Sequence, residues 1–315
     1  MSSYEKLVTD EFLGIRGDLA ISIMFPDLSR TRIQKLILSG CVSENGRTIY
    51  SVKEPLQPSS LIKIFIKESV ISALEPENIP LNIVFEDEFL LVINKPAGLV
   101  VHPAPGNYTG TLVHGLLHYC GDSLKGISGV KYPGIVHRLD QYTSGLMVVA
   151  KEERTHQLLS EQIKQHLIKR VYHAICWGKF KETEGSVCEK ITRSPYERKK
   201  MAILHYGKEA KTNYKVLETY GDKISLVECA LETGRTHQIR LHLCHIGNSI
   251  VGDPLYGRGR KNIDDFLLDG YKWPLSRQAL HSISMSFQHP QTQKTLSFSS
   301  DYPDDFQNLL KALKK

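Results

Sequence analysis

The apolar residues near the N-terminus follow first the spacing of a helix and then the spacing of strands. Within residues 30–40, Ile33, Leu36 and Ile37 recur at helical intervals and predict a helix that ends at Gly40. Short alternating apolar runs follow this helix and are typical of strands. The pattern therefore predicts a small unit in which one basic, amphipathic helix packs on a sheet.

The limits of this unit follow from the segments around it. Asn45-Gly46 indicates a tight turn between two short strands, and residues 60–66 alternate as a third strand. We expect a compact α/β domain over residues 16–70. Residues 1–15 contain little that would anchor them, so we expect an N-terminal arm there.

A stretch rich in acidic residues and proline separates this unit from the rest of the chain. Residues 71–80 have the composition of a linker, and residues 81–315 form the larger predicted domain. Strands dominate the larger domain, and no repeated strand-helix-strand units occur. The sequence therefore predicts an α+β fold with a mixed, mainly antiparallel sheet.

Three helices are expected among these strands. They cover residues 111–119, 152–169 and 237–245. The second has an apolar face that we expect to point inward, formed by Leu158, Leu159, Ile163 and Leu167.

The basic residues are clustered. The chain carries a formal charge of +6, and residues 190–215 contain eight basic residues against two acidic ones. A second cluster on the N-terminal helix consists of Arg30, Arg32 and Lys35. One such run is usually a solvated face, but two runs favour contact with phosphate groups.

Other sequence features point to a cytoplasmic protein. The six cysteines form no C-x-x-C pair, which favours reduced thiols over a disulfide framework. The N-terminus has no apolar leader, and no apolar run approaches membrane-spanning length. We therefore expect a cytoplasmic protein without a membrane partner. The sequence leaves the oligomeric state open.

Asp140 occupies an unusual setting for a carboxylate. It lies between a basic segment and a Thr143-Ser144-Gly145 turn, with apolar runs on both sides. A charge near a core is costly unless it is paired, and Arg240 on the predicted helix 237–245 could pair with it. A capping role for this aspartate is the alternative.

Four motifs in the larger domain resemble, in their order, those of the RluA/RluD family of RNA pseudouridine synthases. They are residues 134–140 (Gly-Ile-Val-His-Arg-Leu-Asp), 169–174 (Lys-Arg-Val-Tyr-His-Ala), 231–240 (Leu-Glu-Thr-Gly-Arg-Thr-His-Gln-Ile-Arg) and 252–257 (Gly-Asp-Pro-Leu-Tyr-Gly). The N-terminal unit resembles an S4-like RNA-binding domain. The resemblance implies a pseudouridine synthase fold behind a small S4-like domain.

The resemblance also implies roles for individual residues. Asp140 would be the nucleophile, Arg240 its paired cation, and Tyr172 the ring that stacks on the target base. Arg138 and His137 would contact the RNA, Arg138 by holding the place of the extruded uridine. In the S4-like domain, RNA contacts are expected from Arg30, Arg32 and Lys35.

The implied reaction breaks the bond between C1′ and N1 of a uridine, rotates the uracil and reconnects it through C5, which requires the base to leave its stack. An aspartate could add to the uracil ring or act at the sugar, and the sequence leaves both routes open. The implied substrate is 23S ribosomal RNA or an assembling large subunit. The same reaction on tRNA, or a non-catalytic ribosomal RNA-binding protein, are the alternatives.

The expected reaction requires no cofactor and no metal, because the uracil is retained and no group is transferred. A metal hydrolase is the rival interpretation, since His237, His242, Cys244 and His245 lie close in sequence. No H-E-x-x-H motif accompanies them, and no phosphate-binding loop or dinucleotide motif occurs. The sequence therefore predicts an enzyme without a metal site.

Overall fold

The computed structural model of this chain contains two compact units, residues 1–73 and 74–315. The structure describes residues 2–26, 28, 30–66, 74–104, 106–124, 133–257, 273 and 277–314. The boundary between the units falls within residues 71–80, the predicted linker. The second half of that stretch packs on the larger unit, because the Glu77 amide donates to the His114 carbonyl and Ile79 lies against Gly115.

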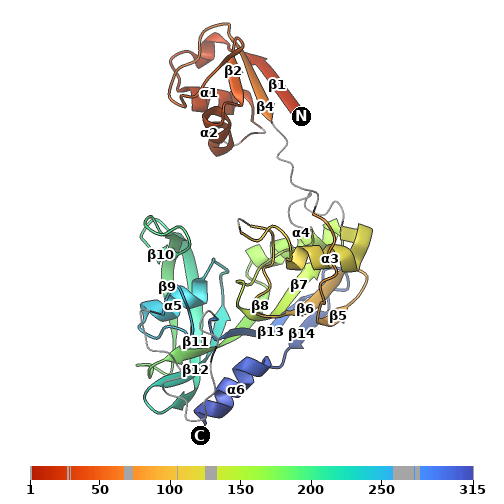
Figure 1. The fold of residues 1–315 in the computed structure, drawn as a ribbon, viewed down its shortest axis with the longest axis vertical. Coiled ribbons are helices and arrows are strands. Elements are labelled where there is room, and N and C mark those ends of the chain that lie inside the picture. The colour runs from red at the N-terminus through yellow and green to blue at the C-terminus, as the bar shows by residue number, and fades with distance from the viewer. Residues whose placement is uncertain are drawn as a thin grey trace. The chain divides into compact units, whose positions relative to one another are not determined.

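The smaller unit is a four-stranded antiparallel sheet with two helices (Figure 1). In sheet order the strands are β1 (Ser2–Leu7), β4 (Leu61–Ile66), β2 (Val42–Glu44) and β3 (Arg47–Thr48), and the helices are α1 (Gly17–Met24) and α2 (Arg30–Leu38). Ile33 and Ile37 of α2 pack in one buried cluster with Ile62 and Ile64 of β4. The predicted helix and the strands around Asn45-Gly46 are confirmed.

The expectation of an arm at residues 1–15 was wrong. Strand β1 pairs with β4 along its whole length, from Ser2 opposite Ile66 to Leu7 opposite Leu61. Strand β4 would otherwise expose one edge of unpaired amides and carbonyls, which β1 satisfies. The strand gives a weak sequence signal because Leu7 is 62% exposed, so its side chains do not follow a buried face.

The larger unit is built on one ten-stranded sheet. Along the sheet lie β10 (Met201–Ile203), β9 (Glu184–Arg193), β11 (Lys208–Tyr220), β12 (Ile224–Leu231), β8 (Lys169–Trp177), β13 (Leu280–Gln288), β7 (Ser144–Ala150), β6 (Leu90–Lys95) and β5 (Ile83–Glu86), with β14 (Thr295–Ser299) paired to β13. Only the β13–β7 pair is parallel among the strand pairs of the described residues. The predicted mixed, mainly antiparallel sheet is confirmed.

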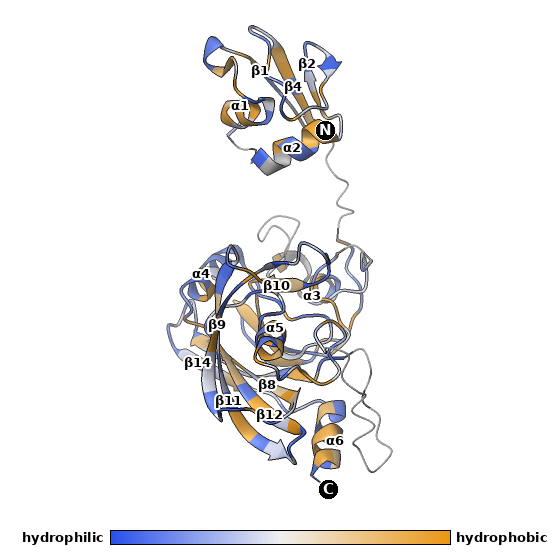
Figure 2. Cartoon of the chain, turned by 90° about the vertical axis from the view of Figure 1, so that its left-hand side faces the viewer, coloured by the Kyte–Doolittle hydropathy of each residue, from blue (hydrophilic) through white to orange (hydrophobic). Residues whose placement is uncertain are grey.

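Helices pack on both faces of the sheet. They are α3 (Leu112–Cys120), α4 (Glu153–Lys164), α5 (Gln238–His245) and α6 (Asp304–Leu313). Apolar residues of α3, α5 and α6 share the main buried cluster with β6, β7 and β8, whereas Leu159 of α4 belongs to the cluster on the other face. Figure 2 shows the apolar residues of β8, β12 and α6 in orange. Successive residues of β6 and β7 alternate between the two clusters, so both strands are buried on both faces.

Helix α4 is shorter than its pattern indicated, and two of its predicted inward positions were wrong. The backbone of His166 adopts a left-handed conformation with φ of 61°, so the helix ends before Leu167, which is 55% exposed. Leu158 is 38% exposed, because it points about 100° away from its fully buried neighbour Leu159. Helix α6 was not predicted at all.

A glycine allows the central strands to approach. Gly145 at the start of β7 has φ of 112°, and a Cβ atom there would lie 2.3 Å from the carbonyl oxygen of Ser282 in β13. Any side chain at this position would push the two strands apart. The parallel pair therefore depends on this glycine, five residues after Asp140.

Three histidines of this unit are held neutral. Burial lowers the pKa of His281 to about 4, and nearby Arg277 lowers it further. Burial likewise lowers the pKa of His242 to about 4 and of His137 to about 3, helped by His245 and Arg170 respectively. His281 hydrogen-bonds the hydroxyls of Ser144 and Ser300. Protonation of these rings in the folded chain therefore costs free energy.

We therefore expect the free energy of unfolding to fall as the pH drops below about 6.5. The unfolded chain binds protons on these histidines at that pH and the folded chain does not, so each contributes a loss of up to about 1.4 kcal/mol per pH unit. Urea titrations between about pH 7 and 5 measure this slope. His281→Asn should flatten it, and an unchanged slope in that variant would contradict the assignment.

Among the described residues, none of the helices combines the length and the apolar character needed to cross a bilayer.

Candidate active site

A pocket of about 190 Å³ lies beside the loop that carries Asp140. Most of its wall comes from the loop before β7, strand β8 and residues 234–240 at the start of α5, and single residues of α4, β12 and β13 complete it. These parts are far apart in the sequence and are brought together by the central strands. The pocket contains five of the predicted site residues, Asp140, Tyr172, Arg240, Arg138 and His137.

Arg240 joins two carboxylates. Its Nη1 donates to Oδ2 of Asp140 at 2.8 Å, while Nε and Nη2 donate to the two oxygens of Asp253 at 2.7 and 2.9 Å. Burial would lower the pKa of Arg240, but its hydrogen bonds to Asp253 and the charges of Asp253 and Asp140 raise it above its ordinary value. The guanidinium is therefore a fixed, permanently charged partner for Asp140.

Asp253 also organises the turn that holds it. Its Oδ1 accepts the backbone amides of Leu255 and Tyr256 at 2.9 and 3.1 Å. The side chain of Asp253 is fully buried, whereas that of Asp140 is 19% exposed. Asp253 thus has a buried, structural position, and Asp140 is the carboxylate that a substrate can reach.

His237 and Tyr256 complete the surroundings of the ion pair. His237 precedes α5 with a left-handed backbone, φ of 56°, and its Nε2 lies 3.9 Å from Oδ2 of Asp140. Its Nδ1 hydrogen-bonds the hydroxyl of Tyr256 at 2.9 Å, and the Tyr256 ring lies 5.3 Å from the Arg240 guanidinium carbon. Burial lowers the pKa of His237, which Asp140 partly offsets.

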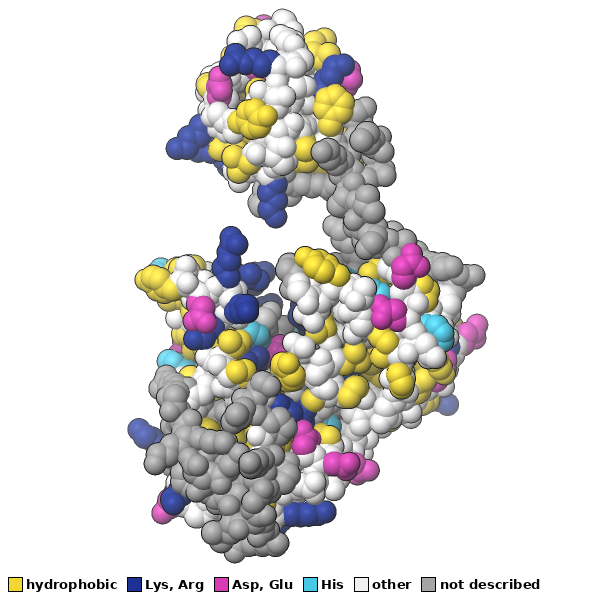
Figure 3. Space-filling view, viewed as in Figure 1, with side chains coloured by type: hydrophobic (Ala, Val, Ile, Leu, Met, Phe, Trp, Pro, Cys, Tyr) yellow, Lys and Arg dark blue, Asp and Glu magenta, His cyan; other side chains and the backbone are white. Residues whose placement is uncertain are grey.

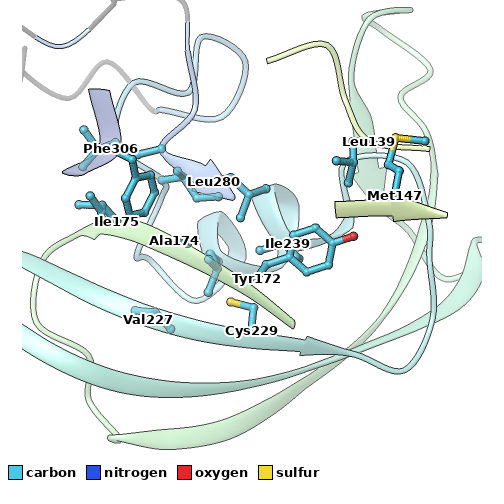
Figure 4. Packing of buried hydrophobic residues seen from close by; sticks show 14 of the residues in the cluster. Leu139, Met147, Tyr172, Ala174, Ile175, Val227, Cys229, Ile239, Leu280 and Phe306 are labelled. Atoms are coloured by element: carbon cyan, nitrogen blue, oxygen red, sulfur yellow. The ribbon is translucent and has the colours of Figure 1, made fainter. Parts of the chain in front are cut away.

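Tyr172 lies on β8 with only 4% of its surface exposed. Figure 4 shows its ring in the same buried cluster as Ile239 and Leu280, with the hydroxyl pointing away from Ala174. Burial raises the pKa of this phenol. The ring and the carboxylate of Asp140 both line the pocket.

Arg138 and His137 differ in their surroundings. Arg138 is exposed at the pocket. The Nε2 of His137 instead accepts the backbone amide of Val148 in β7 at 3.1 Å. Arg138 thus faces solvent at the pocket, and His137 is part of the wall.

A buried lysine connects a second loop to the loop that carries Asp140. Lys95, at the end of β6, is 1% exposed and its ammonium donates to the carbonyls of Pro96, Leu99 and Gln141 at 2.8, 2.8 and 3.0 Å. Burial lowers the pKa of Lys95 to about 7, an effect that Arg277 increases and Asp140 partly offsets. Since Gln141 follows Asp140 directly, these bonds hold the loop that carries Asp140 in place.

The smaller unit places the residues that were expected to contact RNA in different settings. Arg30 is half-exposed and donates to the fully buried Asp18, which also accepts Arg16 and Gln34. Burial raises the pKa of Asp18, but these three hydrogen bonds outweigh it and bring the pKa to about 2. Lys35 is exposed, and the side chain of Arg32 lies outside the described residues.

The histidines that suggested a metal site have other partners. His242 hydrogen-bonds the Thr212 hydroxyl at 2.9 Å, and His237 binds Tyr256 as described. Within the described parts of the chain, no three His, Cys, Asp or Glu side chains are grouped to hold a metal ion.

Sequence reasoning missed Asp253, Lys95 and Arg170. Asp253 and Arg170 stand within motifs that pointed to the family, but nothing in those motifs showed what either side chain contacts. The sequence could have indicated a second acid next to Arg240. A buried guanidinium has several N–H donors, and a single carboxylate seldom accepts all of them.

Comparison with known proteins agrees with this geometry. Residues 89–245 match the model of the RNA pseudouridylate synthase family. "Ribosomal large subunit pseudouridine synthase D" of Zymomonas mobilis is 44% identical, covering 99% of this chain and 98% of its own. A Bacillus subtilis protein described as an uncharacterized RNA pseudouridine synthase is 39% identical over 100% of this chain and 99% of its own.

The fold is also found in solved structures. "Human RNA Pseudouridylate Synthase Domain Containing 4" superposes with a TM-score of 0.59 at 25% identity, covering 74% of this chain and 93% of the human one. The motifs, the ten-stranded sheet and the near full-length identity to these relatives agree. The chain belongs to the RluA/RluD family of RNA pseudouridine synthases, enzymes that isomerise uridine within RNA.

Proposed function

We propose that this enzyme converts specific uridines of large-subunit ribosomal RNA to pseudouridine with Asp140 as the nucleophile. The observation that carries the proposal is the 2.8 Å bond from Arg240 to Asp140 beside the buried ring of Tyr172. The choice of RNA is supported by the names of the relatives, which include large-subunit synthases from Zymomonas, Neisseria and Nitrosomonas.

The arrangement leaves one oxygen of Asp140 for chemistry. Within the described residues, the side-chain contacts of its carboxylate involve Oδ2, which faces Arg240 and His237. Oδ1 can therefore approach an extruded uridine while Arg240 holds the orientation of the carboxylate. Attack of Oδ1 at C1′ would displace the uracil as an anion, and C5 of the rotated ring would then displace the carboxylate from C1′. Addition of Oδ1 to the ring would come before cleavage of the C1′–N1 bond, and the carboxylate would leave the ring again after the new bond has formed. In both routes the new bond forms at C5, which loses its proton.

The neighbouring residues would hold the base. Tyr172 offers a fixed aromatic face to the uracil, and stacking on such a face is a general way to bind an unstacked base. Arg138, exposed beside the pocket, would hold the place that the base has left. Extrusion costs a few kcal/mol, least where the RNA is already looped or mismatched.

A basic surface continues from the pocket toward β9 and β10. Figure 3 shows several Lys and Arg side chains, in dark blue, on this part of the larger unit. Lys190, Lys200 and Lys211 form ion pairs with nearby glutamates. The exposed members for which no ion pair appears among the described residues include Arg193, Arg198, Lys199, Lys208 and Lys215. We name these five residues the hairpin patch and infer that they contact RNA phosphates.

Replacing part of the hairpin patch should weaken RNA binding mainly at low salt. Each phosphate contact that is lost lowers the slope of log Kd against log salt by about one, so Arg198→Ala with Lys199→Ala should lower it by about two. Titrations at several salt concentrations measure the slope. Lys311→Ala on α6, at the opposite end of the unit in Figure 1, is the control. Equal slopes in the two variants would show that the hairpin patch does not contact RNA phosphates.

Release of tritium from RNA labelled at C5 of uridine tests the activity, because that hydrogen leaves when the new bond forms. We expect release from 23S ribosomal RNA and not from tRNA. Release from tRNA alone would identify the other substrate. Binding to ribosomal RNA without release would make the chain a non-catalytic RNA-binding protein.

A further inference from the structure

The pocket wall contains a buried arginine that has no acid partner among the residues that the structure describes. Arg170 on β8 is 5% exposed and lines the pocket, and its Nε has no hydrogen-bond acceptor among the described residues. The two other buried arginines in that part of the chain each contact a carboxylate, Arg240 at 2.7 Å and Arg277 at 2.6 Å. Burying a cation is costly unless an opposite charge accompanies it. Arg170 therefore lacks the anionic partner that would offset the cost of its burial.

A second donor without an acceptor among the described residues belongs to the same pocket wall. The Nε2 of His137 accepts the amide of Val148, so the proton of the neutral ring is on Nδ1. This Nδ1 is buried and has no acceptor among the described residues. The charge of Arg170 lies near enough to lower the pKa of His137. The wall thus contains two N–H groups, one of them cationic, for which the described residues provide no acceptor.

The backbone is shaped around this guanidinium. A Cβ atom at Gly234 would lie 2.9 Å from Nη1 of Arg170 and 3.4 Å from Nη2. Since Gly234 also lines the pocket, the absence of a side chain there leaves the guanidinium in place and accessible from the cavity.

The position of Arg170 relative to Tyr172 suggests which group it receives. The two residues are two apart on one strand and face the same side, about 6–7 Å from each other. A group held by Arg170 would therefore lie next to a base stacked on Tyr172. Phosphodiesters are the only anionic groups of RNA, and a guanidinium matches their oxygens in geometry and charge.

We propose that Arg170 and the Nδ1–H of His137 form a subsite for a non-bridging oxygen of a phosphodiester that flanks the target uridine. The inference rests on the proposed function, because it takes the extruded nucleotide as the occupant of the pocket. The phosphate supplies the negative charge that accompanies Arg170 only in the complex. Binding the correct nucleotide thereby completes a buried ion pair.

The test combines Arg170→Gln with an RNA oligonucleotide in which one flanking phosphodiester is replaced by a neutral methylphosphonate. Either change alone should reduce kcat/KM by about 10- to 100-fold, as expected for a hydrogen bond to a charged group. Together they should cost no more than one of them, because both remove the same contact. Lys199→Ala in the hairpin patch is the control, and its effect should multiply with that of the methylphosphonate.

Several outcomes would overturn the subsite. One is that the effects of Arg170→Gln and of both flanking methylphosphonates simply multiply. A second such outcome concerns an RNA with a thiouridine at the target position. If Arg170→Gln and the thiouridine together cost no more than one of them alone, Arg170 contacts a uracil carbonyl rather than a phosphate. An inactive wild-type enzyme on the unmodified oligonucleotide would count against the proposed function, so the two failures are distinguishable.

The thermal stability of the RNA-free enzyme separates binding from a structural role. Arg170→Gln should leave Tm unchanged or raise it, because no ion pair is lost. Arg277→Gln, which removes a buried arginine from its bond to Asp305, should lower Tm. A decrease in Arg170→Gln as large as in Arg277→Gln would make Arg170 a structural residue and overturn the proposal.

Discussion

Asp140→Asn should reduce turnover by a factor on the order of 10⁴ or more while RNA affinity stays nearly unchanged. The amide keeps the shape of the side chain but is a poor nucleophile. Arg240 retains both bonds to Asp253 in this variant, so the rest of the site should keep its geometry. Single-turnover tritium release measures the rate, and filter binding with the same RNA measures the affinity.

The interpretation depends on the two measurements together. A variant that loses binding as well as turnover would point to a role of Asp140 in folding the loop, for which Tm is the check. Product formation close to the wild-type rate would remove Asp140 from the role of nucleophile.

Asp253→Ala should lower the free energy of unfolding by about 3–5 kcal/mol and also lower turnover. The change leaves Nε and Nη2 of Arg240 without their buried acceptor, together with the amides of Leu255 and Tyr256. A buried charge that loses its partner is among the most destabilising single changes. Urea titration at neutral pH measures the loss.

An exposed pair provides the matched control. Asp222 lies 3.5 Å from Lys179, and both side chains are largely exposed, so Asp222→Ala should change stability by less than about 1 kcal/mol. Asp253→Asn, which keeps one acceptor oxygen, should lie between the two. Equal stabilities of Asp253→Ala and the wild type would show that Arg240 is held by other contacts.

The sequence predicted best those site residues that stand within long motifs. Asp140, Tyr172 and Arg240 stand in long motifs, and the structure brings all three to one pocket. The pairing of Asp140 with Arg240, predicted from the cost of an unpaired charge, is present in the structure. Their catalytic roles stay predictions.

The features that were missed depend on contacts between distant segments. Strand β1 exists because β4 has an open edge, which no pattern within residues 1–15 reveals. Arg30 pairs with Asp18 across two helices, so a residue expected at phosphate also holds the domain together. The spacing of the leucines placed Leu167 on the apolar face of the predicted helix. It carries no information on the left-handed backbone at His166, which ends the helix before Leu167.

The position of β13 between β7 and β8 has a consequence for when the enzyme becomes active during its synthesis. A nascent chain that ends at Gly257 already contains Asp140, Tyr172, Arg240 and Asp253. It lacks residues 280–288, the strand that joins the Asp140 side of the sheet to the Tyr172 side. Sheets that depend on such distant pairings form late. The pocket should therefore close only after residues 280–288 have left the ribosome and paired with both β7 and β8.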